Sequence, residues 1–203
     1  MKRTTTLISE KFTMNNKLHP NFSALILAGG RATRMEGLDK GLVLWKGEPL
    51  IAHVLSAIHV QVDDFVISCN RSFEDYQHYG KVVTDDSPDF LGPLAGIAAA
   101  LPHCQQDWVF VVACDMPCLP TDIIFRLWQA LDDNAHLAVG HDGEHLQPLC
   151  LLLLKSLWSS LDEYVKQGHA SVYKWINTQV HNVAYIEDKH AFMNINSLAE
   201  LDL

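Results

Sequence analysis

Long apolar segments and paired cysteines are both missing from this chain. The apolar run Leu149–Leu154 has only six residues, whereas a membrane-spanning helix needs about 20. The five cysteines form no C-x-x-C pair and leave an odd one over, which indicates neither a disulfide framework nor a cysteine-based metal site. These absences predict a chain that does not span a membrane and that works in a reducing cytoplasm.

Positive charge is scarce as well. The 203 residues include 15 Lys and Arg against 24 Asp and Glu, a net charge of −9, which argues against a nucleic-acid partner held by a broad basic face. Residues 1–20 are polar and lack the apolar core of a signal peptide. We expect them to form a disordered or polar extension, or to lie upstream of a true start at Met14, and residues 21–203 to form one domain.

Apolar runs alternate with amphipathic stretches along the remaining chain, which is typical of β-α-β units. Strands are expected at Ser23–Ala28, Phe65–Cys69, Lys81–Thr84, Trp108–Ala113 and Val180–Ile186, with a hairpin of His136–Gly140 and Leu146–Leu153. Helices are expected at Pro49–Val60, Leu94–Leu101, Thr121–Leu131 with Thr121 as its cap, Ser156–Gln167 and Ser171–Asn177, and after a capping box at Ser197–Glu200. The predicted fold class is α/β, with a mainly parallel sheet between two layers of helices.

The segment Leu25–Gly41 carries the most specific pattern, L-I-L-A-G-G-R-A-T-R-M-E-G-L-D-K-G. An apolar strand runs into two adjacent glycines, which let backbone N–H groups approach a ligand closely. Arg31, Arg34 and Lys40 then supply the positive charge that a polyphosphate needs. Neither the dinucleotide-binding G-x-G-x-x-G nor the P-loop G-x-x-x-x-G-K-[ST] fits this spacing. We therefore interpret the segment as a phosphate-binding loop of a third kind.

This loop resembles that of nucleotidyltransferases with a Rossmann-like three-layer α/β/α fold. Three further segments and a short C-terminal motif are similar to the molybdenum cofactor guanylyltransferase (MobA) family: Asp85-Asp86-Ser87, Gly92-Pro-Leu-Ala-Gly-Ile97, Val111-Val-Ala-Cys-Asp-Met-Pro117 and Asn194-Ile-Asn196. The resemblance spans about Ser23 to Leu201. It implies transfer of GMP from GTP to the phosphate of molybdopterin, with loss of pyrophosphate, and it suggests molybdoenzymes and their maturation factors as partners.

The motif residues are expected to meet at one edge of the sheet. Gly29–Lys40, Asn70, Asp85–Gly92 and Asp115 each follow a predicted strand. In open α/β sheets, ligands bind beyond the carboxyl ends of the strands. The sequence therefore predicts a single site at this edge.

Asp115 is the predicted metal ligand. It follows an apolar strand, and a carboxylate at the tip of a buried strand costs free energy unless something pairs with it. Mg²⁺ bound to nucleotide phosphates is a suitable partner, because it uses only one or two carboxylates. The alternative is an aspartate that only forms a turn or caps a helix.

The resemblance also implies roles for individual residues. Backbone N–H groups near the paired glycines would hold the phosphates, and the cations would offset charge on the transferred and departing groups. A phosphate nucleophile is already ionised at neutral pH, its second pKa being about 6, so no general base is expected. The predicted GTP-binding residues are Leu27, Ala28, Gly29, Lys40, Asp86 and Asp115, and the predicted catalytic residues are Arg34, Lys40 and Asp115.

Several assignments stay open on the residues alone. Asp86 is either a nucleotide ligand, with Asp85 as an ambiguous neighbour, or part of an Asx turn. Ser68 stands where the family can present an asparagine to the nucleotide, so the means of guanine selection is open and Asn70 is a candidate replacement. Asn194 and Asn196 either bind the pterin substrate or shape the turn before the last helix.

The hairpin His141–His145 places two histidines four residues apart. On a turn these positions do not share a helix face, so a metal site there is not favoured. By resemblance, this hairpin with Gln147 and Pro148 would lie near the pterin.

Two alternative functions are kept. One is a related nucleotidyltransferase that uses CTP or a sugar-phosphate acceptor. The other is a non-catalytic nucleotide sensor, against which the presence of Arg34, Lys40 and Asp115 argues.

Overall fold

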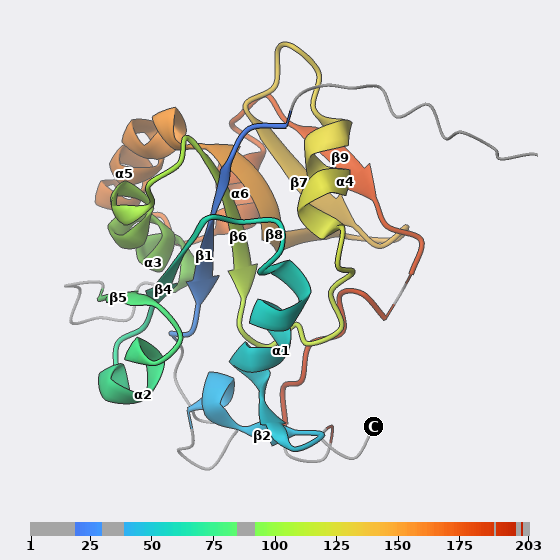
Figure 1. Ribbon diagram of the computed structural model, residues 1–203. Coiled ribbons are helices and arrows are strands. Elements are labelled where there is room, and N and C mark those ends of the chain that lie inside the picture. Colours follow the sequence, from blue (N-terminus) through green and yellow to red (C-terminus); the bar gives the residue numbers. More distant parts are fainter. Residues whose placement is uncertain (1–18, 30–38, 85–91, 189, 198–199, 201–203) are drawn as a thin grey trace, which may run out of the picture.

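The computed structural model describes residues 19–29, 39–84, 92–188, 190–197 and 200. Nearly all of the proposed extension 1–20 lies outside this set, as do the predicted site residues Arg34 and Asp86. Within the described residues, helices pack on both faces of a central sheet (Figure 1).

The central sheet is mainly parallel, as predicted. Its strands are β1 Phe22–Leu27, β4 Asp64–Ser68, β5 Lys81–Val83, β6 Trp108–Ala113, β7 Leu137–His141, β8 Leu146–Leu154 and β9 Asn182–Tyr185. Their order is β5-β4-β1-β6-β8-β7-β9. The predicted hairpin is confirmed as β7 and β8, and β8 runs antiparallel to both β7 and β6. The described strands therefore combine a parallel half with a hairpin inserted beside β6.

Helices cover both faces because the central strands are apolar on both. The helices are α1 Leu50–Ile58, α2 Phe73–Gln77, α3 Pro93–Ala100, α4 Ile123–Ala130, α5 Trp158–Lys166 and α6 Val172–Ile176, with short 3₁₀ turns η1 Lys40–Leu42, η2 Leu101–His103 and η3 Lys155–Leu157. Alternate residues of β1 face opposite sides, so Ile26 packs with α1 and α4, and Leu25 packs with α3, α5 and α6. A strand that is buried on both faces has a continuous apolar sequence, so β1 and β6 could be predicted from the sequence.

The strand order creates a switch point at β1. Leu27 at its end lies opposite Ser68 of β4 on one side and Ala113 of β6 on the other. The chain leaves β1 toward β4 and returns later to β6, so the loops after β1 and β6 diverge from one point. This is where open α/β sheets bind ligands.

The structure also differs from the prediction. A small hairpin, β2 Leu44–Trp45 and β3 Glu48–Pro49, precedes α1, so Pro49 ends a strand and does not open the helix. Its tip residues Lys46 and Gly47 both have positive φ, as two-residue hairpin turns require. The short helix α2 was not predicted.

The expected cap Thr121 is wrong. Helix α4 begins at Ile123, and its N-cap residue is Asp122, whose side chain makes no capping bond. The Asp122 carboxylate instead accepts a hydrogen bond from Arg126 Nε one turn later, at 2.8 Å. Side-chain pairing within the helix has replaced the cap here.

Candidate active site

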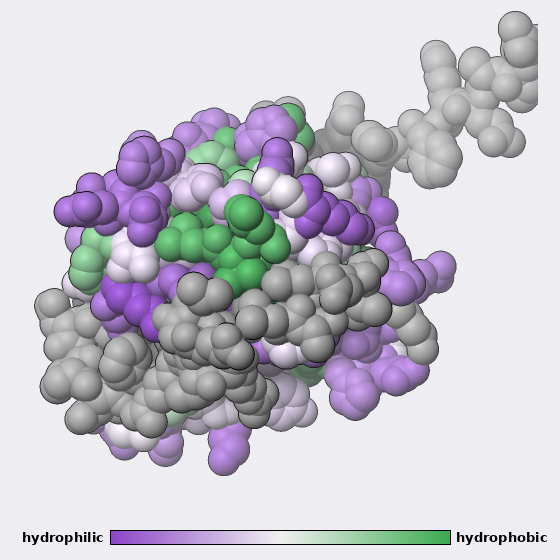
Figure 2. All heavy atoms as spheres, turned by 90° about the horizontal axis from the view of Figure 1, so that it is seen from below, coloured by the Kyte–Doolittle hydropathy of each residue, from purple (hydrophilic) through white to green (hydrophobic). Residues whose placement is uncertain are grey.

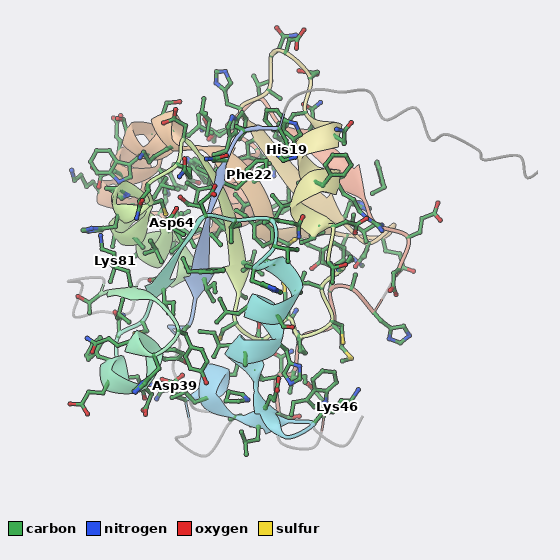
Figure 3. The ribbon with its side chains drawn as sticks, in the orientation of Figure 1. His19, Phe22, Asp39, Lys46, Asp64 and Lys81 are labelled. Atoms are coloured by element: carbon green, nitrogen blue, oxygen red, sulfur yellow. The ribbon has the colours of Figure 1, made fainter. Side chains whose placement is uncertain are left out.

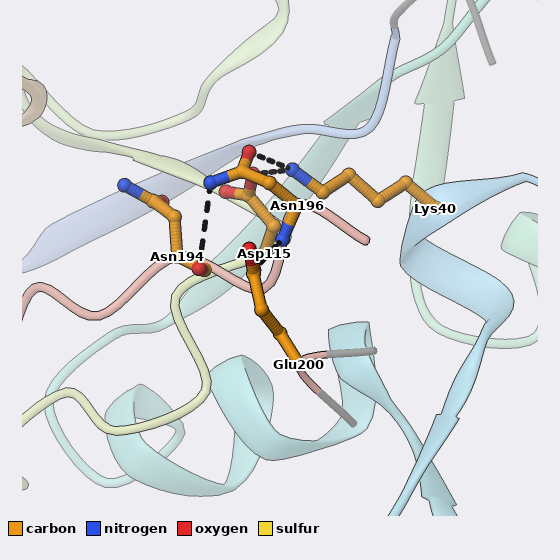
Figure 4. Close-up of polar contacts among 5 residues, drawn as sticks. All are labelled: Lys40, Asp115, Asn194, Asn196 and Glu200. Carbon is orange, nitrogen blue, oxygen red and sulfur yellow. Dashed lines mark hydrogen bonds and ion pairs between the residues drawn. The ribbon is translucent and has the colours of Figure 1, made fainter. Parts of the chain in front are cut away.

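Lys40 connects three distant parts of the chain. It starts η1, whose short turn is closed by the Leu42 N–H bonded to the Asp39 carbonyl at 3.0 Å. The Lys40 Nζ atom forms an ion pair with the Asp115 carboxylate and donates to Asn196 Oδ1 at 2.8 Å (Figure 4). The partners lie 75 and 156 residues along the chain. The fold therefore brings the predicted cation and the predicted metal ligand together.

Asp115 lies just beyond β6, with only 14% of its side chain exposed. Its position is set by the backbone: the preceding Cys114 N–H donates to the Leu27 carbonyl at 3.0 Å, and the Asp115 carbonyl accepts from Ile195 N–H at 3.1 Å. Oδ2 pairs with Lys40, whereas Oδ1 is buried and has no hydrogen-bond partner among the described residues. A buried oxygen without a partner is costly, so this atom is suited to a further ligand.

The segment Met193–Asn196 presents the Asn196 side chain to Lys40 and its apolar side chains to the core. Ile195 is fully buried in a small cluster with Trp45 and Leu50, and Met193 packs against it. Asn196 lies between this anchor and Lys40, and its Nδ2 atom donates to the Asn194 carbonyl at 3.4 Å. The β2–β3 hairpin, which sequence reasoning missed, thus supports one wall of the site.

Glu200 completes part of the predicted capping box. Its carboxylate accepts a hydrogen bond from the Asn196 backbone N–H at 2.6 Å (Figure 4). This bond, followed by those to Ser197, holds the pKa of Glu200 below its usual range. The helix expected after it lies outside the described residues.

Behind Lys40 is a second network that the sequence did not suggest. The Asp39 carboxylate has only 5% of its side chain exposed and accepts a hydrogen bond from Tyr76 OH at 2.5 Å and from Arg71 Nε at 3.1 Å. Tyr76 lies on α2 and is fully buried. An acid directly before the loop lysine, and a tyrosine in an unpredicted helix, gave no local pattern to detect.

The nucleotide-binding edge is only partly described. Leu27 and Ala28 are buried, their backbone already pairing within the fold: Ala28 N–H donates to the Ser68 carbonyl at 2.8 Å. Gly29 is exposed at the end of β1. These three predicted residues therefore lie at the switch point of the sheet, and Gly29 is the exposed one.

Ser68 does not face this edge. It is 4% exposed, and its Oγ atom would lie 2.8 Å from a Cβ at Gly96. Gly96 is thus required for close packing of α3 on β4, in addition to any role near the nucleotide. Asn70, two residues beyond Ser68, is half-buried at the strand end.

The hairpin around His141 is organised by an aspartate. Asp142 Oδ1 accepts from the backbone N–H groups of His145 and Glu144 at 2.7 and 2.8 Å, and its Oδ2 accepts from Gln147 at 2.8 Å. These bonds hold the pKa of Asp142 below its usual range. The His141 ring contacts Tyr185, with ring centroids 4.9 Å apart. Among the described residues, no three His, Cys, Asp or Glu side chains cluster as a metal site.

Viewed from the carboxyl end of the parallel strands, the surface has an apolar area near its centre, bordered by hydrophilic side chains and by the undescribed residues (Figure 2). Mixed apolar and polar surface is typical of sites for heterocyclic ligands. Lys46 extends from the β2–β3 tip, with its Nζ 3.9 Å from the centre of the Trp45 ring. It belongs to the hairpin and is separate from the Lys40 pair.

Comparison with known proteins gives a consistent result. Residues 24–183 match the family described as "MobA-like NTP transferase domain". The chain is 42% identical over 183 residues to the molybdenum cofactor guanylyltransferase of Shewanella putrefaciens, covering 89% of this chain and 94% of that protein. It is 37% identical over 182 residues to the enzyme of that name from Vibrio cholerae, covering 88% and 89%.

The fold is also similar to a solved structure, molybdopterin-guanine dinucleotide biosynthesis protein A from Archaeoglobus fulgidus. The TM-score is 0.70 at 23% identity, covering 89% of this chain and 95% of that one. No helix within the described ranges has the length and apolar character needed to cross a bilayer.

Proposed function

Because the chain belongs to the MobA-like NTP transferase family, we propose that it transfers GMP from GTP to the phosphate of molybdopterin, with or without bound molybdenum, and releases pyrophosphate. The products are the guanine dinucleotide form of the cofactor and pyrophosphate. Relatives named molybdenum cofactor guanylyltransferase, at about 40% identity over most of both chains, support this choice of substrates.

One observation carries the proposal: Lys40 of the glycine-rich loop, Asp115 at the end of β6 and Asn196 near the C-terminus form one hydrogen-bonded group. The group lies at the switch point of the sheet, where a nucleotide would enter. A cation and a carboxylate held together at such a point can act on the same phosphate group.

Nucleotidyltransferases of this family generally use a divalent metal ion. We assign this ion as Mg²⁺ and Asp115 as its protein ligand. The residues present fit it, because Asp115 Oδ1 is a buried carboxylate oxygen without a partner among the described residues, and Mg²⁺ on nucleotide phosphates needs one or two carboxylates. When bound, the ion would neutralise charge on the phosphate oxygens.

The protein's own groups then have separate tasks. Lys40 would offset charge on the transferred and departing phosphates, and its bond to Asn196 would keep it directed at the side from which the acceptor arrives. The exposed amide region at Gly29 would hold phosphate oxygens, and the proposal retains Arg34 and Asp86 in the roles predicted for them. An ionised phosphate acts as nucleophile, so positioning and charge neutralisation account for the catalysis.

Other parts of the proposal rest on sequence or resemblance. GTP and molybdopterin are the substrates, and molybdoenzyme maturation factors are expected to receive the product. The cytoplasm stays the predicted location, because the five cysteines are free and cysteines persist as thiols in a reducing compartment.

The test is incubation with each of the four labelled nucleoside triphosphates, molybdopterin and Mg²⁺, followed by measurement of pyrophosphate and of the dinucleotide. We expect product with GTP and little with the other three. Product with CTP would indicate a cytidylyltransferase, and turnover only with a sugar phosphate would indicate another acceptor. Tight GTP binding with no pyrophosphate under any condition would indicate a sensor.

A further inference from the structure

The Asp39 network is a buried polar cluster near the site, and the mechanism above gives it no task. Asp39 touches neither the Asp115 carboxylate nor Asn196 in any described contact. It immediately precedes Lys40, and its carboxylate accepts hydrogen bonds from Tyr76 at 2.5 Å and from Arg71 at 3.1 Å. Both donors come from the segment after β4, on the far side of β1 from Asp115.

We propose that Asp39, held by Tyr76 and Arg71, is a positioning residue that fixes the direction of Lys40. The inference rests on the proposed role of Lys40 and extends it to residues with no contact to substrate.

The first support is the way the chain is fixed on each side of Lys40. Asp39 is tied to α2, and Gly41 packs so tightly that an added Cβ would lie 2.5 Å from Tyr76 OH and 3.1 Å from Cys114 Sγ. Lys40 therefore lies between two residues that both contact Tyr76, Asp39 through its carboxylate and Gly41 through its backbone. From this position its Nζ atom reaches Asp115 and Asn196.

The second support is chemical. Burial is the main cause that raises the pKa of Tyr76, and the neighbouring Cys114 and Asp39 raise it further, so the phenol keeps its proton and donates to Asp39. Arg71 offsets the charge of the carboxylate, with about a third of its own side chain exposed. A carboxylate held on both oxygens cannot rotate to pair with Lys40 itself, which leaves Lys40 for Asp115 and the phosphates.

The chain offers a matched control at the opposite edge of the sheet. Ser23 Oγ donates to Asp64 Oδ1 at 2.5 Å, the same length as the Tyr76–Asp39 bond, and Ser23 is fully buried. Ser23 lies at the start of β1, so Ser23→Ala removes an equivalent hydroxyl without affecting the Lys40 turn.

The experiment compares Tyr76→Phe, Arg71→Ala and Ser23→Ala with the unsubstituted chain. Two quantities are measured: kcat and KM for GMP transfer, and the acetic-anhydride labelling of Lys40 relative to Lys166, which is paired with Asp162 on the surface at 2.6 Å. We expect Tyr76→Phe to lower kcat about 10- to 100-fold, since small misplacement of a catalytic group costs this much. KM for GTP should stay within about twofold, because the contact that Lys40 makes with the phosphates acts mainly in the transition state.

Labelling of Lys40 should rise relative to Lys166 in Tyr76→Phe, and less strongly in Arg71→Ala, while Ser23→Ala leaves both quantities unchanged. If Tyr76→Phe does not fold, Arg71→Ala provides the test, because the Arg71 side chain is partly exposed and its removal should not prevent folding. Unchanged Lys40 labelling and kcat in the folded variants, or equal losses in Ser23→Ala, would overturn the inference.

Failure of the proposed function is a separate result. A wild-type chain that transfers no GMP removes the function, while the labelling ratio still shows whether Asp39 positions Lys40.

Discussion

The Ser23–Asp64 network at the amino end of the parallel strands and the Lys40–Asp115 pair at their carboxyl end are of opposite kinds. At the amino end, Ser23 Oγ bonds to Asp64 and to Gln106 N–H, and the other Asp64 oxygen accepts from Gln105 N–H at 3.3 Å. At the carboxyl end, Asp115 has one oxygen on Lys40 and one without a partner among the described residues. Figure 3 shows Asp64 and Asp39 on these two sides.

The difference separates structure from function. A network whose oxygens are all bonded to fixed groups stabilises the strands it joins, because each buried polar atom is satisfied. A network with an unsatisfied buried carboxylate oxygen retains a cost that a ligand can offset. Substitutions in the Ser23–Asp64 network should therefore change stability, and those of Lys40 and Asp115 should change activity.

The largest expected effect is that of Lys40→Ala. Loss of one charge-stabilising contact typically lowers kcat by about 10²- to 10³-fold. GMP transfer and the melting temperature should be measured together, with Lys166→Ala as the surface control. Near-normal turnover would remove Lys40 from the mechanism.

Asp115→Asn is expected to lower GMP transfer by about 10²-fold, and it tests the metal assignment directly. The amide keeps the size of the side chain and leaves the backbone bond to Ile195 intact, but it is a much weaker ligand for a hard cation. Binding of Mn²⁺ in the presence of GTP, followed by electron paramagnetic resonance, should weaken strongly. If Mn²⁺ affinity were unchanged, another residue would hold the metal.

Ser23→Ala should have the reverse profile. It leaves Asp64 and the Gln106 N–H each short of one partner, and an unsatisfied buried group costs about 1–3 kcal/mol. Urea unfolding should show this loss, while kcat at a temperature well below the transition is unchanged. A fall in kcat without loss of stability would contradict the division between the two ends.

The smallest difference between the two ends is expected in alkaline solution, because buried thiols at both ends make the stability of the fold fall as pH rises. Burial raises the pKa of Cys69, beyond β4, to about 11 and that of Cys104, before β6, to about 12. The unfolded chain releases these protons near pH 9.0, so the stability from the buried thiols is complete below pH 9 and is lost as pH rises through 11 and 12. The loss is at most about 1.4 kcal/mol per pH unit for each thiol.

Urea unfolding between pH 8 and 10.5 measures this slope. The slope should be smaller in Cys104→Ala, although that variant starts from a lower stability. An identical slope in the variant would show that the thiol keeps its ordinary pKa in the folded chain.

Parts of the fold were predictable because they depend on local patterns. The runs around Leu25 and Val111 are apolar on both faces and could only be buried strands. The β2–β3 hairpin was missed, because its turn Lys46-Gly47 lacks the usual asparagine or aspartate and Pro49 is also typical of a helix start. The cap at Thr121 failed because Asp122 paired with Arg126 instead.

By itself, the sequence determined the alternation of strands and helices and the glycine-rich loop, and it predicted that Lys40 and Asp115 share one edge of the sheet. Only the tertiary structure decided that Lys40 bonds directly to both Asp115 and Asn196, that Asp39 is fixed by Tyr76, and that Ser68 lies beneath α3. The physical reason is the sequence separation over which each kind of interaction acts. Periodicity and turn chemistry act over a few residues, whereas contacts across 75 or 156 residues depend on strand order and on the packing of both sheet faces.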